Sequence, residues 1–255
     1  MKSTAVVTGA SSGLGAEFAR QLAAKGFDLI IAARRRERLE CLARELEQKH
    51  GVAVQVFAVD LTKPDVLEEL ARLIQSRSDV EILVNNAGYG AGGRYDQADT
   101  ERQMGMIALH VTAAARLTRA ALPQMVARGR GAVINMASVV AFAHLPGSTL
   151  YCTTKKWLVD FSRSIADELA GTGVHIQALC PGFTRTEAME GKKLPEFLWL
   201  TCEEVVAASL RAAERGSGVC VPSFTYKLLV FILRSPLGGL LSWARMARKR
   251  RKARM

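Results

Sequence analysis

The sequence lacks the features that mark a metal-binding or disulfide-stabilised protein. Its five cysteines are odd in number, widely scattered and without CxxC spacing, so we expect free thiols, a reducing compartment and no metal site. We expect no signal peptide, because Lys2 leads directly into a strand-like run. Of the 255 residues, 23% are charged and 49% hydrophobic, a balance that excludes a disordered, collagen-like or coiled-coil chain.

Acidic residues are absent from the last 40 residues, which contain nine Lys and Arg. Because the formal net charge of the whole chain is +11, the remainder carries only +2. The basic excess therefore belongs to the C-terminal segment alone. A protein that binds nucleic acid over its surface needs a basic body as well, and no aromatic residues interleave with this basic run. Nucleic acid is therefore not an expected partner.

Short apolar runs, rich in β-branched residues, alternate with segments of helical periodicity. Runs that are apolar at successive positions indicate strands buried on both faces, as in a parallel sheet. The expected strands are residues 5–7, 27–33, 52–59, 80–84, 132–136, 174–179 and 219–221, and the expected helices are 14–25, 36–49, 64–77, 101–128, 150–171 and 202–215. This alternation predicts an α/β fold, a single doubly wound parallel-sheet (Rossmann) domain over residues 1–222, with a helical C-terminal extension over 223–255.

A glycine-rich loop follows the first expected strand and opens the first expected helix. It reads Gly9-Ala10-Ser11-Ser12-Gly13-Leu14-Gly15 and is preceded by Thr8. Glycines permit a tight turn and close approach to a pyrophosphate, and the helix N-terminus offers free N–H groups. A structural turn would also fit these glycines, but their place between a strand and a helix favours nucleotide binding.

The GxxxGxG spacing of this loop and the motifs downstream resemble the short-chain dehydrogenase/reductase family. The shared motifs follow in the family's order over residues 2–221, and they are Asp60, Asn85-Asn86-Ala87-Gly88, Ser138, Tyr151-x-x-x-Lys155 and Pro181-Gly182-Phe183-Thr184-Arg185-Thr186. The resemblance implies an oxidoreductase that uses NAD(P) to interconvert a ketone and a secondary alcohol. It also implies a small-molecule carbonyl or alcohol substrate and a homo-oligomer, either a dimer or a tetramer.

The resemblance also assigns the residues expected to bind the cofactor. They are Gly9, Ser11, Ser12, Gly13, Leu14, Gly15, Arg34, Asp60, Leu61, Asn86, Ala87, Gly88, Tyr151, Lys155, Pro181, Gly182, Thr184 and Thr186. Asp60 resembles the family residue that hydrogen-bonds the adenine amine, and the alternative is that it caps the following helix.

The end of the second expected strand favours NADP over NAD. A carboxylate there would bind the ribose 2′-OH and repel a 2′-phosphate, but this strand is followed by Arg34, Arg35 and Arg36. Guanidinium groups bind phosphate well. We expect Arg34 to contact the 2′-phosphate, and Arg35 and Arg36 to be solvated residues at a helix start. The family's second basic residue, just before Gly13, is replaced by Ser12.

Tyr151 and Lys155 lie four residues apart in an expected helix and so share one face. A nearby ammonium should lower the pKa of a phenol, so this pair could exchange a proton with a carbonyl or alcohol oxygen. Without the glycine-rich loop upstream, we would interpret Tyr151 and Lys155 as surface residues of an amphipathic helix. The resemblance implies that Tyr151 transfers the proton, Lys155 bonds the nicotinamide ribose and Ser138 orients the substrate oxygen. For Ser138, the alternative is a strand-end hydroxyl bonded to backbone.

His110 is a departure from the family pattern. The family usually carries Asn at this position, where it is thought to hold a water that links the catalytic lysine to solvent. A histidine can also bond a water and carry a proton, so His110 joins the catalytic candidates. The alternative is that it only fills the site.

The segments expected to line the substrate site, residues 139–146 and those after Gly182, are mainly apolar. They favour a lipophilic carbonyl compound. One alternative is a 3-oxoacyl thioester of an acyl carrier protein or coenzyme A, whose anionic groups the basic tail could attract. Another is a non-catalytic nucleotide-binding or membrane-associated protein of the same fold.

The C-terminal extension begins with an apolar run, residues 224–233, that is too short to span a bilayer. Residues 237–254 have the pattern of a basic amphipathic helix able to lie on an anionic membrane. The alternative is that residues 224–241 pack on the domain, as a pocket cover or a subunit contact. We therefore expect a cytoplasmic protein, with peripheral membrane contact left open.

Overall fold

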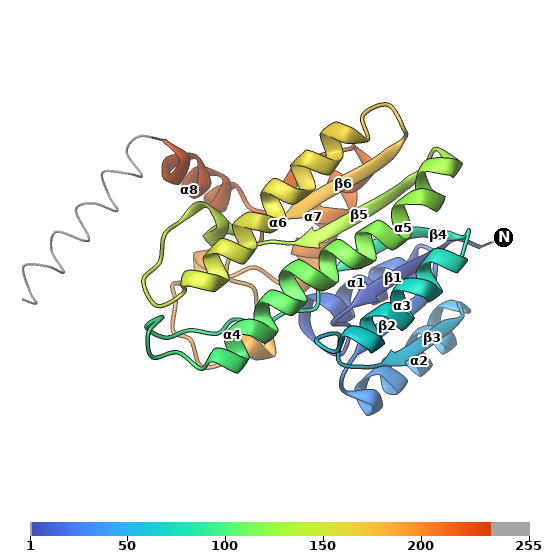
Figure 1. The fold of residues 1–255 in the computed structure, drawn as a ribbon, viewed down its shortest axis with the longest axis horizontal. Coiled ribbons are helices and arrows are strands. Elements are labelled where there is room, and N and C mark those ends of the chain that lie inside the picture. The colour runs from blue at the N-terminus through green and yellow to red at the C-terminus, as the bar shows by residue number, and fades with distance from the viewer. Residues whose placement is uncertain (1, 236–255) are drawn as a thin grey trace, which may run out of the picture.

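A computed structural model describes residues 2–235 of the chain. Its centre is a parallel sheet of seven strands in the order β3-β2-β1-β4-β5-β6-β7 (Figure 1). The strands are β1 (Thr4–Thr8), β2 (Asp28–Ala33), β3 (Val54–Ala58), β4 (Val80–Asn85), β5 (Gly131–Met136), β6 (Val174–Leu179) and β7 (Val219–Cys220). The strand order reverses between β1 and β4. The doubly wound fold is thus confirmed, and a ligand crevice is expected at the carboxyl ends of these two strands.

Helices cover both faces of the sheet (Figure 1). They are α1 (Gly13–Ala24), α2 (Arg36–His50), α3 (Pro64–Ser76), α4 (Thr100–Ile107), α5 (Ala114–Arg128), α6 (Thr149–Glu168), α7 (Cys202–Glu214) and α8 (Phe224–Arg234). One core layer joins α1, α2 and α7 to the sheet, and the other joins α3 and α5. Because side chains on both faces of the strands are buried, the strands read as continuous apolar runs.

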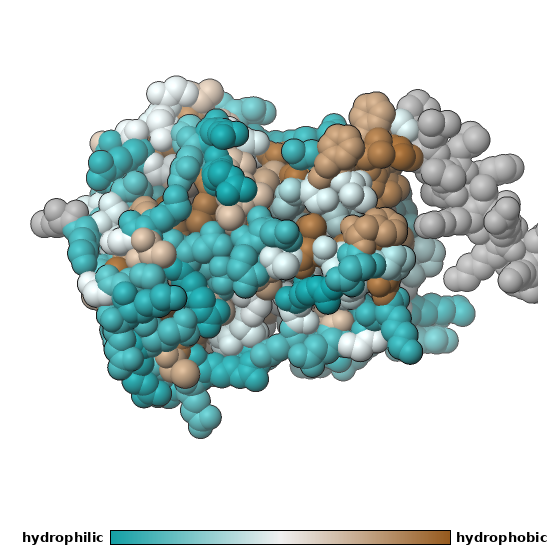
Figure 2. Space-filling model, turned by 180° about the vertical axis from the view of Figure 1, so that it is seen from behind, coloured by the Kyte–Doolittle hydropathy of each residue, from teal (hydrophilic) through white to brown (hydrophobic). Residues whose placement is uncertain are grey.

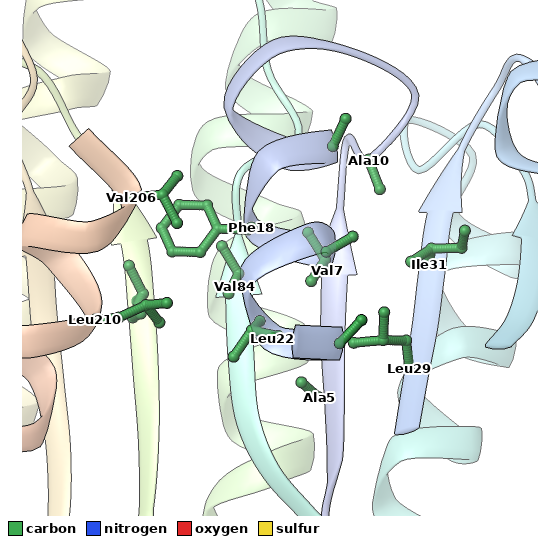
Figure 3. Close-up of a cluster of buried hydrophobic side chains, with 14 of the residues drawn as sticks. Ala5, Val7, Ala10, Phe18, Leu22, Leu29, Ile31, Val84, Val206 and Leu210 are labelled. Carbon is green, nitrogen blue, oxygen red and sulfur yellow. The ribbon is translucent and has the colours of Figure 1, made fainter. Parts of the chain in front are cut away.

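The first core layer fixes the start of α1 against β1. Phe18 and Leu22 of α1 are fully buried. Figure 3 shows them between Val7 of β1 and the α7 residues Val206 and Leu210. Complete burial of such side chains contributes about 1.5–3 kcal/mol each. This packing holds the glycine-rich loop, which connects β1 to α1, at the carboxyl edge of the sheet.

The helix expected over residues 101–128 is interrupted. A π-helical turn, Ala108–Ala113, separates α4 from α5 and contains the buried His110. Such turns are rare, occur mostly as single turns inside α-helices and are frequent at functional sites. Apolar periodicity could not reveal it, because the helical direction continues through the turn.

Helix α8 begins the C-terminal extension and packs on the domain through part of its surface. Tyr226 and Val230 are buried against Val139, whereas Phe224 is 82% exposed and Phe231 73% exposed. Figure 2 shows apolar surface at the end of the molecule where α8 lies. The basic amphipathic helix expected over residues 237–254 lies outside the described residues. Among residues 2–235, no helix has the length and apolar character needed to cross a bilayer.

Candidate active site

The glycine-rich loop forms a backbone cradle at the N-terminus of α1. Gly9 and Gly13 have φ angles of +69° and +54°, the left-handed region that favours glycine. At Gly15, a Cβ atom would lie 2.3 Å from the Gly9 carbonyl oxygen, so no larger residue fits. Ser12 precedes the helix but gives it no side-chain cap. The first N–H groups of α1 therefore remain available to an anion.

The loop after β4 is hydrogen-bonded to this cradle. The Asn86 side chain donates to the carbonyl oxygens of Thr8 and Gly9, at 2.9 and 3.3 Å. The Thr8 hydroxyl accepts from the backbone N–H groups of Asn86 and Ala87, both at 3.0 Å. These contacts bring the Asn86–Gly88 motif to the cradle, and together the two loops fit a dinucleotide at the topological switch point.

Arg35, rather than Arg34, contacts this cradle. The guanidinium of Arg35 donates to the hydroxyls of Ser11 and Ser12, at 3.1 and 2.6 Å. The expectation that Arg35 is merely solvated is therefore wrong. Arg34 is exposed, and among the described side chains no acid pairs with it. Arg36 pairs with Glu40, one turn along α2, at 3.6 Å.

Asp60 lies after β3 in a turn of its own. Its carboxylate accepts from the backbone N–H and the hydroxyl of Thr62, at 3.0 and 2.8 Å. Burial alone would raise the pKa of Asp60, but the Thr62 hydrogen bonds and the nearby Arg34 lower it overall. Asp60 does not cap α3, because the N-cap of that helix is Lys63. The neighbouring Leu61 is buried.

Tyr151 and Lys155 lie on the same face of α6, close to Ser138 at the end of β5. The Lys155 ammonium is 5.7 Å from the centre of the Tyr151 ring, and it donates to the Met136 carbonyl oxygen at 2.6 Å. Ser138 accepts from the backbone N–H of Val140 at 3.3 Å, so the backbone contact considered for it from the sequence is present. The three candidate catalytic side chains are thus gathered at one place.

Burial controls the protonation of this pair. It lowers the pKa of Lys155 to about 7. It raises the pKa of Tyr151 and outweighs a hydrogen bond from Ser138 that lowers it. The shift of the Tyr151 pKa is therefore upward, opposite to the lowering expected from the sequence. Loss of hydration destabilises the phenolate more than the hydrogen bond from Ser138 stabilises it. Tyr151 is therefore a protonated phenol at neutral pH.

His110 lies beside this pair, in the π-helical turn. Its Nδ1 atom is 2.9 Å from the Thr154 hydroxyl, which itself donates to the Leu150 carbonyl oxygen at 2.8 Å. A hydroxyl has one proton to donate, so this network assigns the His110 proton to Nδ1. The Nε2 atom is then a buried acceptor, without a hydrogen-bond partner among the described residues. Burial and the neighbouring Lys155 lower the pKa of His110 to about 2.

Gly88 makes room for that nitrogen. A Cβ atom at Gly88 would lie 2.4 Å from His110 Nε2. The edge of the His110 ring faces the Tyr151 ring, with 5.9 Å between their centres. The candidate cofactor loop, the candidate acid and His110 are therefore in one cluster.

The loop after β6 closes the site. The Pro181 carbonyl oxygen accepts from the Val139 N–H at 3.1 Å, and the buried Thr184 hydroxyl donates to the Gly182 carbonyl oxygen at 3.2 Å. The Thr186 methyl would contact a Cβ atom placed on Gly13 at 3.1 Å. This loop thus spans the distance from the Ser138 segment to the phosphate loop.

Tyr226 of α8 holds this loop and was missed from the sequence. Its hydroxyl accepts from the Phe183 N–H at 3.0 Å and donates to the Leu198 carbonyl oxygen at 2.7 Å. A Cβ atom at Gly182 would lie 2.0 Å from the Tyr226 ring. No local pattern marks Tyr226, because it reads as one more apolar position of the run 224–233.

Comparison with known proteins agrees with this geometry. The family model described as short chain dehydrogenase matches residues 3–196. The chain belongs to the short-chain dehydrogenase family. It is therefore an oxidoreductase with a nicotinamide cofactor, as the resemblance implied.

Two similar relatives are both from Danio rerio. The 17-beta-hydroxysteroid dehydrogenase type 3 is 32% identical over 91% of this chain and 76% of its own length. The very-long-chain 3-oxoacyl-CoA reductase-A is 33% identical over 81% of this chain and 65% of its own length. The family thus includes relatives named for steroid and for acyl-thioester substrates.

Two solved structures share the fold over nearly the whole chain. A short-chain dehydrogenase from Sphingobium yanoikuyae in complex with NADPH is 36% identical, with a TM-score of 0.84, and the match covers 94% of this chain and 95% of the other. The bulky-bulky ketone specific alcohol dehydrogenase from Comamonas testosteroni is 30% identical, with a TM-score of 0.80, over 99% and 94% of the two chains.

Proposed function

We propose that this chain is an NADP(H)-dependent enzyme that interconverts a ketone and a secondary alcohol on a lipophilic substrate. The observation that carries the proposal is the position of the partly buried Tyr151 phenol, with its raised pKa, beside Lys155 and Ser138. A phenol that keeps its proton at neutral pH is suited to donate it to a carbonyl oxygen as that oxygen gains negative charge. Tyr151 is therefore already in the protonation state that ketone reduction requires at neutral pH.

The bound cofactor would supply the hydride, and the chain supplies binding and the proton. Backbone N–H groups at the start of α1 would hold the pyrophosphate of that cofactor, and Asp60 would hold its adenine end. The Ser138 hydroxyl donates to the substrate oxygen and orients it toward Tyr151. Tyr151 transfers its proton to that oxygen. Lys155 bonds the nicotinamide ribose, and its positive charge stabilises the phenolate that remains.

His110 has a positioning role in this proposal. Its partner-free Nε2 can accept a hydrogen bond from a water held near Lys155, as the family asparagine is thought to do. Because the pKa of His110 is about 2, the ring stays neutral at neutral pH and accepts a hydrogen bond without taking up the proton. His110 therefore positions the water that returns a proton to the Tyr151–Lys155 pair.

The cofactor proposal rests on charge at the end of β2. Arg34 has an exposed guanidinium, Arg35 lies against the phosphate loop, and no carboxylate follows β2 directly. A 2′-phosphate would be attracted to these groups. The NADPH complex of the Sphingobium yanoikuyae relative supports this choice.

The substrate proposal rests on the apolar segments around the site. The 3₁₀ turn after Ser138, Val139–Phe142, is wholly apolar, and Phe183 is 38% exposed on the loop after β6. The relatives named for a hydroxysteroid and for bulky ketones support a large lipophilic carbonyl compound. The alternative is a 3-oxoacyl thioester, which the other Danio rerio relative favours.

A panel of bulky ketones, steroid ketones and 3-oxoacyl thioesters tests the proposal. The absorbance of NADPH at one protein concentration measures consumption for each compound. We expect consumption with lipophilic ketones. Consumption with acyl thioesters alone would favour the alternative, and consumption with neither class would contradict both proposals.

We further propose a homo-oligomer, and peripheral contact of the C-terminal extension with an anionic membrane through the helix expected over residues 237–254. Phe224, Leu228 and Phe231 are exposed on α8, and the last 40 residues carry nine cations and no acid. Apolar burial and attraction to anionic lipid would act together. Co-sedimentation with anionic vesicles tests this, because a chain ended at Leu241 loses seven cations and should bind less at low salt. Equal vesicle binding by the two chains, or no binding by either, would contradict membrane contact by residues 237–254.

A further inference from the structure

Glu187 lies where an anion from the cofactor is expected. It directly follows Thr186, in the loop after β6, and pairs with two cations near the end of β2. Its carboxylate accepts from Arg35 at 3.1 Å and from Arg38. These contacts join positions that are 152 and 149 residues apart in the sequence. The loop after β6 is therefore tied to the candidate 2′-phosphate site.

The Arg35 guanidinium is shared between this acid and the phosphate loop. Its Nε and Nη2 atoms donate to Ser11 and Ser12, and its Nη1 atom donates to Glu187. A phosphate is bound best by two donors of one guanidinium fork. A 2′-phosphate that bonds the outer fork of Arg35, Nη1 and Nη2, would therefore share Nη1 with the Glu187 carboxylate.

We infer that Glu187 is an internal competitor of the 2′-phosphate for Arg35, and that it thereby sets how strongly this chain prefers NADPH to NADH. The inference rests on the proposed use of NADP(H). Hydrogen bonds from Arg35 and Arg38 lower the pKa of Glu187, so the carboxylate is an anion at neutral pH. Two anions at one guanidinium group repel each other, whereas the 2′-OH of NADH brings no charge.

The geometry allows the Glu187 carboxylate to move away from Arg35. Its side chain is 50% exposed, and that of Arg35 is 44% exposed, so the pair is accessible to a ligand and to solvent. Glu187 also borders a cavity of about 430 Å³ that Met189 and Trp199 help to line. The carboxylate can therefore leave Arg35 without unfolding of the sheet or of α1.

Ligand affinity measures this competition without turnover. The probes are NADPH, NADH and 2′,5′-ADP, which carries the 2′-phosphate but no nicotinamide. We expect Glu187→Gln to bind NADPH and 2′,5′-ADP about fivefold more tightly than the native chain, the size of one partly exposed ion pair. Its affinity for NADH should change less than twofold. The gain should shrink at about 1 M salt, where charges are screened within about 3 Å.

Glu190→Gln is the matched control. It removes the same charge three residues further along the loop, and in the part of the chain that the structure describes Glu190 forms no ion pair. We expect no change in any of the three affinities. A second control is Glu187→Gln in an Arg35→Ala background, where the gain should mostly vanish because the competitor and the phosphate no longer share that group.

The outcomes separate this inference from the proposed cofactor. Weaker or unchanged binding of 2′,5′-ADP by Glu187→Gln would overturn the competition, as would an equal gain in Glu190→Gln. Equal affinity of the native chain for NADPH and NADH would instead contradict the proposed NADP preference. A phosphate-specific gain in Glu187→Gln would then still support competition. Thermal unfolding of each variant checks that it is folded.

Discussion

The Nδ1 atom of His110 lies 2.9 Å from the hydroxyl oxygen of Thr154, three residues after Tyr151 on α6. This contact fixes the ring of His110 relative to the candidate acid. It directs Nε2 toward Gly88, where only a glycine leaves room. The π-helical turn that carries His110 is thus tied both to the candidate catalytic helix and to the candidate cofactor loop.

His110→Asn tests whether His110 substitutes for the family asparagine. We expect the variant to retain or raise ketone reduction, because an asparagine can hold the same water. His110→Ala is the control, and it should lose activity because no group remains to hold the water. The kcat of each variant and its pH profile are the measurements. A collapse of kcat in folded His110→Asn would show that the imidazole has a catalytic role of its own.

His110→Asn should also lose less folding stability at acidic pH than the native protein. The pKa of His110 is about 2 in the folded state and about 6.5 when the chain is unfolded. Below pH 6.5 only the unfolded state binds this proton, so the native chain loses up to about 1.4 kcal/mol of stability per pH unit. His110→Asn lacks this loss. Urea unfolding at pH 7 and pH 5 measures the difference, and parallel pH dependence in the two proteins would contradict burial of a neutral His110.

The depressed pKa of Lys155 acts in another pH range. Its pKa of about 7 lies below the ordinary value near 10.4. Between about pH 10.4 and pH 7 the unfolded state binds this proton more readily than the folded state, so the folded state loses stability as the pH falls. Below about pH 7 both states are protonated, and the effect is constant. Lys155 thus contributes little to the comparison between pH 7 and pH 5.

Tyr226→Phe tests whether the Tyr226 hydroxyl of α8 positions the loop after β6. The ring that covers Gly182 stays, but the Phe183 N–H and the Leu198 carbonyl lose their partner. Leaving buried groups unpaired costs about 1–3 kcal/mol. We expect lower stability and a raised KM for the ketone, with kcat changed less. Tyr95→Phe, at a tyrosine that is 60% exposed, is the control and should behave as the native chain. An unchanged KM in Tyr226→Phe would show that the hydroxyl does not position the loop.

Arg34→Ala tests the proposed NADP preference. A charge-assisted contact contributes about 1.5–3 kcal/mol, so NADPH should bind the native chain roughly tenfold or more tightly than NADH. The variant should lose most of that difference and keep its NADH affinity. Fluorescence titration of both cofactors measures it. Retention of the full preference in Arg34→Ala would assign the discrimination to other groups, such as Arg35.

Local sequence signals predicted the fold and the part of the site that lies in contiguous motifs. The glycines of the phosphate loop and the four-residue spacing of Tyr151 and Lys155 are such signals. The pairing of Glu187 with Arg35 is not, because it joins residues 152 positions apart in the chain. Burial is equally non-local, and for this reason the direction of the Tyr151 pKa was predicted wrongly from one neighbouring charge.

The central claim is that Tyr151 supplies the proton in an NADPH-dependent carbonyl reduction, and Tyr151→Phe tests it most directly. This change removes only the phenolic O–H. With the best ketone from the panel, consumption of NADPH by the native chain is compared with that by the variant, and NADPH affinity is titrated for both. The account predicts loss of almost all turnover with affinity nearly unchanged. A folded variant that keeps more than a few per cent of native turnover would contradict it.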